Sequence, residues 1–356
     1  MRKRLSAAVT FACLMASPAA RAGASAGAYL GAGCTGAAQV PRFAKMAGHA
    51  PATVTEFAEN SDWEHMRGSI NWAANCWHGA GIDRMVQSVP MLMSTGTLAQ
   101  GAAGAYDAEF VALGKLLVAD HQESTLIRIG WEFNGDWYRW GAAADPASFV
   151  TYYRRIVTAL RSVPGNNFKF IWNPALGQQA IGADRVYPGD DVVDYIGLDV
   201  YNQSWRPQDR DPATRWNGLL TQAYGLDWLS SFAAAHDRAI VLPEWGTGTR
   251  PDGAGGGDDP LFIANMAAWI ARNNVFLQNY WDYNAGDFNG TLSDGSQPLS
   301  AAAYVAAFGT RSTTAVPEPA TWLMLVTGFG FAGLTRRWTA RKAAGVSRRE
   351  PTPLAG

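Results

Sequence analysis

Eight short apolar runs recur along the middle of this chain, and their order constrains its fold more than any other feature. Runs of this length suit strands that are buried on both faces of a parallel sheet, and helical patterns lie between several of them. Alternating strands and helices favour a parallel α/β sheet, and eight such strands predict closure into a single (β/α)8 TIM barrel. The runs are residues 28–31, 53–57, 88–93, 125–130, 168–172, 195–199, 239–242 and 275–280.

The segment that follows the fourth run illustrates a helix of this barrel. Asp145-Pro146 offers an N-cap with proline in the first turn, and Pro164-Gly165 ends the segment. A doubly wound nucleotide-binding sheet fits less well, because no Gly-x-Gly-x-x-Gly motif follows the first run. The apolar face of the predicted helix consists of Phe149, Tyr152, Tyr153, Ile156 and Leu160.

Residues 1–22 have the pattern of a secretory signal peptide, with a basic start, an apolar stretch and the small-residue site Ala20-Arg21-Ala22. We therefore expect export and removal of this segment. Export would leave Cys34 and Cys76 as the cysteines of the mature chain, in an oxidising compartment where a single pair is more often bridged than free. We expect a disulfide between them; two separate buried thiols are the alternative.

Residues 312–356 differ in composition from the body at residues 23–311. A short linker leads to Pro317-Glu318-Pro319, an apolar run at 320–334 and Arg336-Arg337. The apolar run is shorter than the ~20 residues that span a bilayer comfortably, so by itself it predicts a marginal anchor. This order resembles the PEP-CTERM sorting tail of Gram-negative exopolysaccharide producers. The resemblance implies recognition by export and sorting machinery, transient membrane association, and display at the cell surface or release.

The charge of the body narrows the class of partner. The basic ends carry +4 and +5 within a total of −1, so residues 23–335 carry −10. An acidic body argues against nucleic acid, whose binding depends on Lys and Arg, and suits a neutral polyhydroxyl substrate. The five histidines are scattered without metal-binding spacing, so we expect no metal and no cofactor. The sequence also lacks the Gly-x-Ser-x-Gly elbow of serine hydrolases.

Two glutamates, Glu132 and Glu244, stand where predicted strands give way to loops, each beside a tryptophan. Function in such barrels gathers at the C-terminal ends of the strands. Two carboxyl groups across a cleft are what cleavage of a glycosidic bond requires. An aromatic wall would raise the pKa of Glu132, while polar neighbours would keep Glu244 ionised. A loop cap or a salt bridge is the alternative for either residue alone; the matched pair favours catalysis.

The residues around Glu132 resemble glycoside hydrolase family 26, whose fourth strand reads approximately Arg-x-x-His-Glu-x-Asn-Gly-x-Trp-x-x-Trp. Residues 171–174, 194–202 and 244–246 follow the later strands of that family. The resemblance implies that Glu132 is the acid/base, that Glu244 is the nucleophile, and that the Tyr201 hydroxyl bonds to this nucleophile. The matching residues in the fourth-strand motif are Arg128, Trp131, Glu132, Asn134, Gly135, Trp137 and Trp140.

The resemblance also implies a substrate-binding set, in which Trp137, Trp140 and Trp281 stack on sugar rings. Trp131 stands where the family usually has histidine, which leaves the sugar open. We expect a retaining glycoside hydrolase that acts on β-linked polysaccharide: mannan first, then glucan, xylan or exopolysaccharide. A non-catalytic polysaccharide-binding or matrix protein and an exopolysaccharide transglycosylase are the alternatives. The substrate-binding set is Arg128, Trp131, Asn134, Trp137, Trp140, Tyr201, Trp245 and Trp281.

Overall fold

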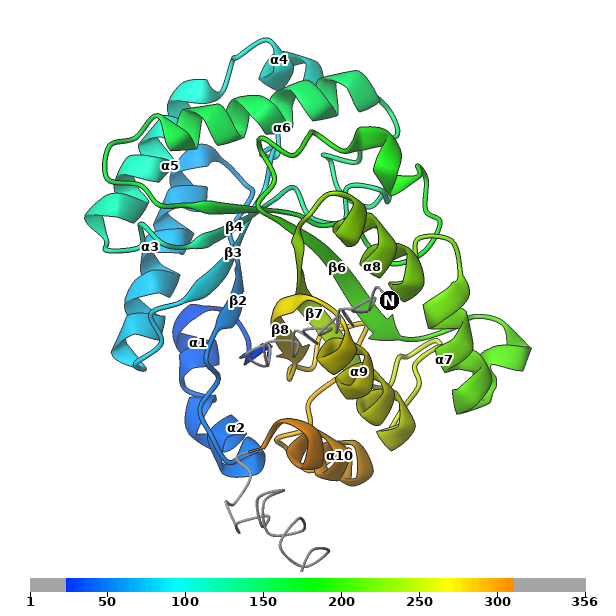
Figure 1. The fold of residues 1–356 in the computed structure, drawn as a ribbon. Helices are drawn as coiled ribbons and strands as arrows, with labels where there is room; N and C mark the ends of the chain where they lie inside the picture. Colours follow the sequence, from blue (N-terminus) through cyan, green and yellow to red (C-terminus); the bar gives the residue numbers. More distant parts are fainter. Residues whose placement is uncertain (1–23, 310–356) are drawn as a thin grey trace, which may run out of the picture. The chain divides into compact units, whose positions relative to one another are not determined.

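The computed structural model describes residues 24–309, and its strands close into a parallel barrel in chain order, with β1 paired to β8 (Figure 1). This confirms the (β/α)8 barrel predicted from the apolar runs. The strands are β1 Ser25–Tyr29, β2 Val54–Phe57, β3 Met85–Val89, β4 Leu126–Ile129, β5 Lys169–Trp172, β6 Tyr195–Asn202, β7 Ala239–Thr247 and β8 Val275–Trp281.

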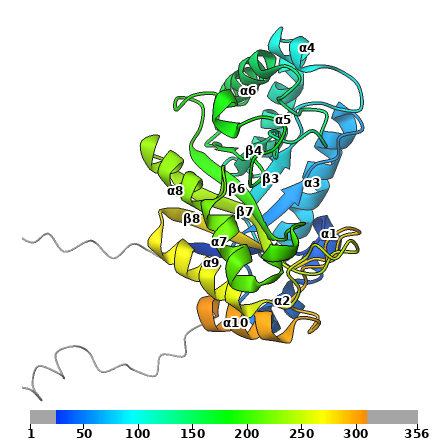
Figure 2. The ribbon, with the colours of Figure 1, turned by 90° about the vertical axis from the view of Figure 1, so that its right-hand side faces the viewer.

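Helices surround these strands, and the two views show α9 beside α10 and α5 beside α6 on the outside (Figures 1 and 2). The α-helices are α1 Gly33–Ala37, α2 Val40–Ala47, α3 Trp63–Gly79, α4 Leu98–Ala102, α5 Asp107–Ala119, α6 Pro146–Arg161, α7 Pro212–Thr221, α8 Leu226–Ala235, α9 Pro260–Arg272 and α10 Pro298–Phe308. Short 3-10 helices are η1 Ala183–Val186 and η2 Pro207–Arg210.

Helix α6 forms where the capping pattern predicted it. The Asp145 side chain accepts a 3.1 Å hydrogen bond from the backbone N–H of Ser148, and Pro146 occupies the first turn, where its missing N–H costs nothing. Each large apolar side chain buried on such a face contributes about 1.5–3 kcal/mol to stability. The predicted apolar face is fully buried against the barrel: Phe149, Tyr152, Tyr153, Ile156 and Leu160.

Two strands begin three residues earlier than the apolar runs suggest. We expected the third strand at 88–93, but β3 ends at Val89, directly before Pro90. Proline has no N–H to donate to a sheet ladder, so the apolar residues beyond it continue as loop. The first strand likewise begins at Ser25 rather than at Ala28, and the chain turns at Gly31, whose φ of 108° suits glycine.

Strand β7 carries an extra residue at its middle, relative to both of its neighbours. Val241 pairs with Gly197, and Glu244 pairs with Asp199, so an advance of three residues along β7 corresponds to two residues along β6. The register between β7 and β8 shifts over the same stretch. Pro243 lies in this bulge, and its carbonyl accepts a 2.6 Å hydrogen bond from the Thr55 hydroxyl. Bulges beside active sites commonly redirect a side chain, and here the residue that follows is Glu244.

A disulfide joins Cys34 in α1 to Cys76 in α3, closing a loop with a sequence separation of 42. The predicted signal peptide at 1–22 and the predicted linker and sorting tail at 312–356 lie outside the described residues. Within residues 24–309, no helix has both the length and the apolar character needed to cross a bilayer.

Candidate active site

Glu132 and Glu244 line one cleft at the C-terminal end of the barrel, with a volume of about 970 Å³. Glu132 follows β4 as predicted, whereas Glu244, which we expected just beyond a strand at 239–242, lies within β7 because that strand continues to Thr247. Tyr201 from β6 and Trp281 from β8 line the same cleft. The barrel thus brings together two carboxyl groups that are far apart in the sequence.

The backbone at Glu132 adopts a conformation that residues other than glycine rarely adopt. Its φ is 52°, in the left-handed region, and Gly130 nearby has a φ of 51°. A non-glycine residue in this region costs of order 1–3 kcal/mol and persists only where its surroundings hold it. Here the N–H of Glu132 donates a 2.8 Å hydrogen bond to the carbonyl of Asn173, at the end of β5. This bond ties the position of Glu132 to the neighbouring strand.

The Glu132 carboxyl group is poised to carry a proton near neutral pH. Burial, and then the negative charge of Glu244, raise its pKa to about 7. The positive charge of Arg128 and a 2.8 Å hydrogen bond from the Trp137 indole N–H to Oε2 oppose this rise. The upward direction is the one predicted from the sequence, and burial together with the charge of Glu244 outweighs the lowering by Arg128 and by the Trp137 hydrogen bond.

Glu244 is held at both carboxyl oxygens by hydrogen bonds from other side chains. Its Oε1 accepts a 2.5 Å hydrogen bond from Nη1 of Arg128, and its Oε2 accepts a 2.6 Å hydrogen bond from the Tyr201 hydroxyl. The bond from the charged guanidinium is the stronger of the two, and together they fix the orientation of the carboxyl group. The predicted contact between Tyr201 and Glu244 is therefore present in this structure.

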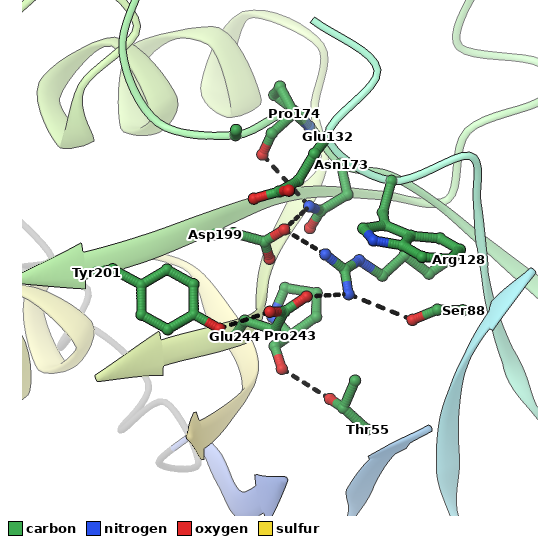
Figure 3. Close-up of polar contacts among 12 residues, drawn as sticks. Thr55, Ser88, Arg128, Glu132, Asn173, Pro174, Asp199, Tyr201, Pro243 and Glu244 are labelled. Carbon is green, nitrogen blue, oxygen red and sulfur yellow. Dashed lines mark hydrogen bonds and ion pairs between the residues drawn. The ribbon is translucent and has the colours of Figure 1, made fainter. Parts of the chain in front are cut away.

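Arg128 is fully buried and links the polar groups beneath the cleft (Figure 3). Besides Glu244, its guanidinium contacts Asp199 through Nη2 and the Ser88 hydroxyl through Nη1, the latter at 3.2 Å. The rings of Phe57 and Trp131 each lie with their centroid 5.7 Å from the guanidinium carbon. Aromatic faces attract a cation at this range, so the two rings help to hold Arg128.

Asp199 is a third carboxyl group of the site that the sequence reasoning did not single out. It lines the cleft, and its Oδ2 accepts a 2.9 Å hydrogen bond from the Asn173 amide in addition to the Arg128 contact. Burial raises the pKa of Asp199 well above its ordinary value against the opposing charge of Arg128. A signal was available: Asp199 and Tyr201 are two residues apart on one strand, so their side chains point to the same side.

Two predicted sugar-binding tryptophans line the cleft and two do not. Trp137 is exposed and Trp281 half-buried, and both border the cleft. The prediction that Trp140 stacks on sugar is wrong, because its ring is fully buried and stacks on Tyr138 at 4.6 Å between ring centroids. Trp245 is also fully buried; successive residues of a strand face opposite sides, so it points away from the side that Glu244 faces.

Three other residues of the predicted substrate-binding set are buried and act on the protein itself. Asn134 donates to and accepts from the backbone of Ala175, at 2.8 Å in each case, which fixes the loop after β5. Arg128 holds Glu244 and Asp199, as described above, and Trp131 packs against Arg128 and Phe57. Direct sugar contact by these three side chains is not what the structure supports.

The central segment of the chain, residues 108–227, is similar to glycosyl hydrolase family 26 and matches the model of that family. A mannan endo-1,4-beta-mannosidase of Bifidobacterium adolescentis is 27% identical over 185 residues, which are 48% of this chain and 18% of that protein. A protein of the same name from Thermothelomyces thermophilus is 32% identical over 141 residues, covering 39% of this chain and 26% of the relative. The aligned segments thus span about a quarter or less of these relatives.

Solved structures share the fold. A modular endo-beta-1,4-mannanase from Cellulomonas fimi superposes with a TM-score of 0.53 at 21% identity, covering 75% of this chain and 65% of that one. A Bacillus subtilis mannanase superposes with a TM-score of 0.54 at 17% identity, covering 81% and 86%. The fold is therefore shared with these structures, and the residues that match the glycosyl hydrolase family 26 model include Glu132, Asp199 and Tyr201.

Proposed function

We propose that this chain is a retaining glycoside hydrolase that cleaves β-linked polysaccharide, with mannan as the first substrate to test. One observation carries the proposal: two carboxyl groups of opposite character line one cleft. The pKa of Glu132 is raised to about 7, whereas Glu244 is held by Arg128 and Tyr201. A carboxyl group that holds a proton near neutral pH is suited to be the acid, and a second carboxyl group that donors fix in the same cleft is suited to be the nucleophile.

In the first step Glu132 gives its proton to the glycosidic oxygen, and Glu244 attacks the anomeric carbon to form a covalent glycosyl ester. Esterification removes the negative charge of Glu244, which is one cause of the raised pKa of Glu132. The pKa of Glu132 then falls, so the ionised group takes a proton from the water that hydrolyses the ester. The same pair thus supplies an acid in the first step and a base in the second.

The order in which we propose to test substrates follows the names of the similar proteins. Two are named mannan endo-1,4-beta-mannosidase, and a third, from Acetivibrio thermocellus, is named endoglucanase H and is 25% identical over 194 residues. Mannan therefore comes first and β-glucan second. Xylan and bacterial exopolysaccharide complete the panel.

The test is a reducing-sugar assay of the full chain on this panel, with Glu132→Gln and Glu244→Gln as matched controls. We expect new reducing ends from at least one β-linked polymer, and little activity from either variant. Products longer than the starting oligosaccharide would identify a transglycosylase instead. Binding of a polymer without cleavage by the wild type would identify the non-catalytic alternative and overturn the proposal.

We also propose that the chain is exported, on the pattern of residues 1–22 and the PEP-CTERM resemblance of residues 317–337. Fractionation of the cells that make the full chain, followed by N-terminal sequencing, tests this proposal. Mature protein beginning at Gly23 outside the cytoplasm is expected. Intact protein beginning at Met1 in the cytoplasm would contradict it.

A further inference from the structure

Trp205 is the most exposed of the large hydrophobic side chains in residues 24–309, with 66% of its surface accessible, and it lines the same cleft as the two glutamates. It lies in the loop between β6 and η2 and belongs to none of the motifs around the carboxyl groups. An exposed indole costs free energy in water unless something covers it, and a tryptophan ring is suited to lie against the apolar face of another group.

The indole of Trp205 is supported by Arg250, whose guanidinium carbon lies 5.7 Å from the ring centroid. Arg250 is itself held in place: it reaches Asp252 at 3.0 Å, the Gln203 amide oxygen at 3.3 Å and Asp287 at 3.6 Å. A ring resting on a cation that other groups fix loses little further freedom when a ligand arrives.

This pair is connected to the catalytic groups along one wall of the cleft. Phe288, next to Asp287 in the sequence, packs edge-on against Tyr201 with 4.8 Å between ring centroids. The hydroxyl of Tyr201 bonds to Glu244, and Asp287 contacts Arg250 beneath Trp205. Tyr201, Trp205, Arg250, Asp287 and Phe288 all line the cleft.

The chemistry of this part of the cleft fits an uncharged ligand. The charge of Arg250 is countered by Asp252 and Asp287, so little net attraction remains for an acidic group. Neutral amide side chains also line the cleft. They can hydrogen-bond to the hydroxyl groups of a ligand without favouring a positively or a negatively charged one. These residues are Gln178, Gln179, Gln203 and Gln222.

We propose that Trp205, supported by Arg250, is a stacking platform for a neutral pyranose unit of the substrate, away from the bond that is cleaved. This proposal rests on the proposed function and adds to it a requirement for a long chain. A monosaccharide bearing an activated leaving group would occupy the site at the carboxyl groups and leave Trp205 uncovered. An oligosaccharide of several units would also use the platform.

The experiment compares four full-length proteins: wild type, Trp205→Ala, Trp205→Phe and Trp72→Ala. Trp72 is the matched control because it is 47% exposed on α3 but does not line the cleft. Rates are measured on mannohexaose, cellohexaose, xylohexaose and a β-1,4-linked hexamer of mannuronate, and on the nitrophenyl glycoside of whichever sugar is cleaved. Thermal unfolding of each variant confirms that it is folded.

We expect Trp205→Ala to raise KM for the cleaved neutral hexasaccharide about three- to tenfold, the range that one aromatic contact supplies, with the nitrophenyl glycoside unaffected. Trp205→Phe should restore most of the affinity, and Trp72→Ala should match the wild type. Unchanged KM in a folded Trp205→Ala protein that cleaves the hexasaccharide overturns the platform alone. Preference for the mannuronate hexamer over mannohexaose overturns the neutral ligand. Failure of the wild type on every hexasaccharide and its polymer overturns the proposed function, and the platform with it.

Discussion

Nη1 of Arg128 donates a 2.5 Å hydrogen bond to Oε1 of Glu244, in a place where the arginine has no contact with solvent. The same guanidinium holds Asp199, so one cation positions two carboxylates of the cleft. Removing one partner of a buried ion pair leaves an unpaired charge, which is far more costly than losing an exposed salt bridge.

We therefore expect Arg128→Lys to lower the free energy of unfolding by about 3 kcal/mol, and kcat by about a hundredfold. Lysine keeps the charge but has a single donor group, which cannot reach Asp199, Glu244 and Ser88 in the geometry of the guanidinium. Urea denaturation and steady-state kinetics measure the two effects. Arg154→Lys, at an exposed ion pair with Asp191, is the control and should change neither.

The raised pKa of Glu132 predicts a basic limit to activity. The first step requires the protonated carboxyl group, so kcat/KM should fall as pH rises through about 7. In Glu132→Gln the residual kcat/KM should no longer fall as pH rises through about 7. A wild-type profile that stays flat from pH 6 to pH 9 would be inconsistent with Glu132 as the acid.

The same carboxyl group makes stability depend on pH in a defined direction. Its pKa is higher in the folded chain than its ordinary value of 4.5, so its contribution is fully present below pH 4.5 and is lost as pH rises through about 7. Glu132→Gln has no such group. We expect the melting temperature of the variant, relative to wild type, to be higher at pH 8 than at pH 5. The opposite order would show that the carboxylate is stabilised by folding.

Loss of the disulfide should destabilise the barrel without changing the residues that line the cleft. The bond between Cys34 and Cys76 closes a separation of 42 residues, which corresponds to about 4 kcal/mol in the chain-entropy model. Urea denaturation of the Cys34→Ser/Cys76→Ser double variant measures the loss, and treatment of the wild type with reductant should reproduce it. Alkylation of both cysteines in unfolded, unreduced wild type would show that the bond does not form.

We expect Trp131 to affect catalysis indirectly, because its ring helps to position Arg128. Trp131→Ala removes a buried ring beside the guanidinium and leaves a cavity, so we expect a loss of about 3–5 kcal/mol and a lower kcat. Trp131→Phe keeps an aromatic face and should recover most of the kcat. If both variants keep full kcat, the ring is only a packing element.

The barrel could be predicted because buried parallel strands appear as apolar runs, but the ends of strands could not be placed as well. The run at 88–93 stays apolar past Pro90, and only the missing N–H of that residue ends β3. Pro243 is a signal for the bulge in β7, because a proline within a strand is confined to edges and bulges, but the register across it depends on the pairing of β7 with β6 and β8.

The two glutamates could be predicted because each directly follows an apolar run. The tryptophans could not be sorted in this way: Trp137 and Trp140 stand in one motif, yet the first is exposed in the cleft and the second buried. Which way an aromatic side chain of a loop points depends on its packing, not on its spacing from a strand. Trp205 lies in a polar loop without a motif, so only the assembled cleft reveals it.

In the proposed mechanism Glu244 becomes covalently attached to the sugar, while Glu132 does not. The most direct measurement is to incubate the full chain with an activated 2-deoxy-2-fluoro glycoside of the sugar it cleaves, which slows hydrolysis of the ester, and to identify the labelled residue by peptide mass spectrometry. We expect one sugar per chain, attached to Glu244, and no attached sugar in Glu244→Gln. A label on Glu132 or Asp199, or an unlabelled enzyme that releases the inverted anomer, would contradict it.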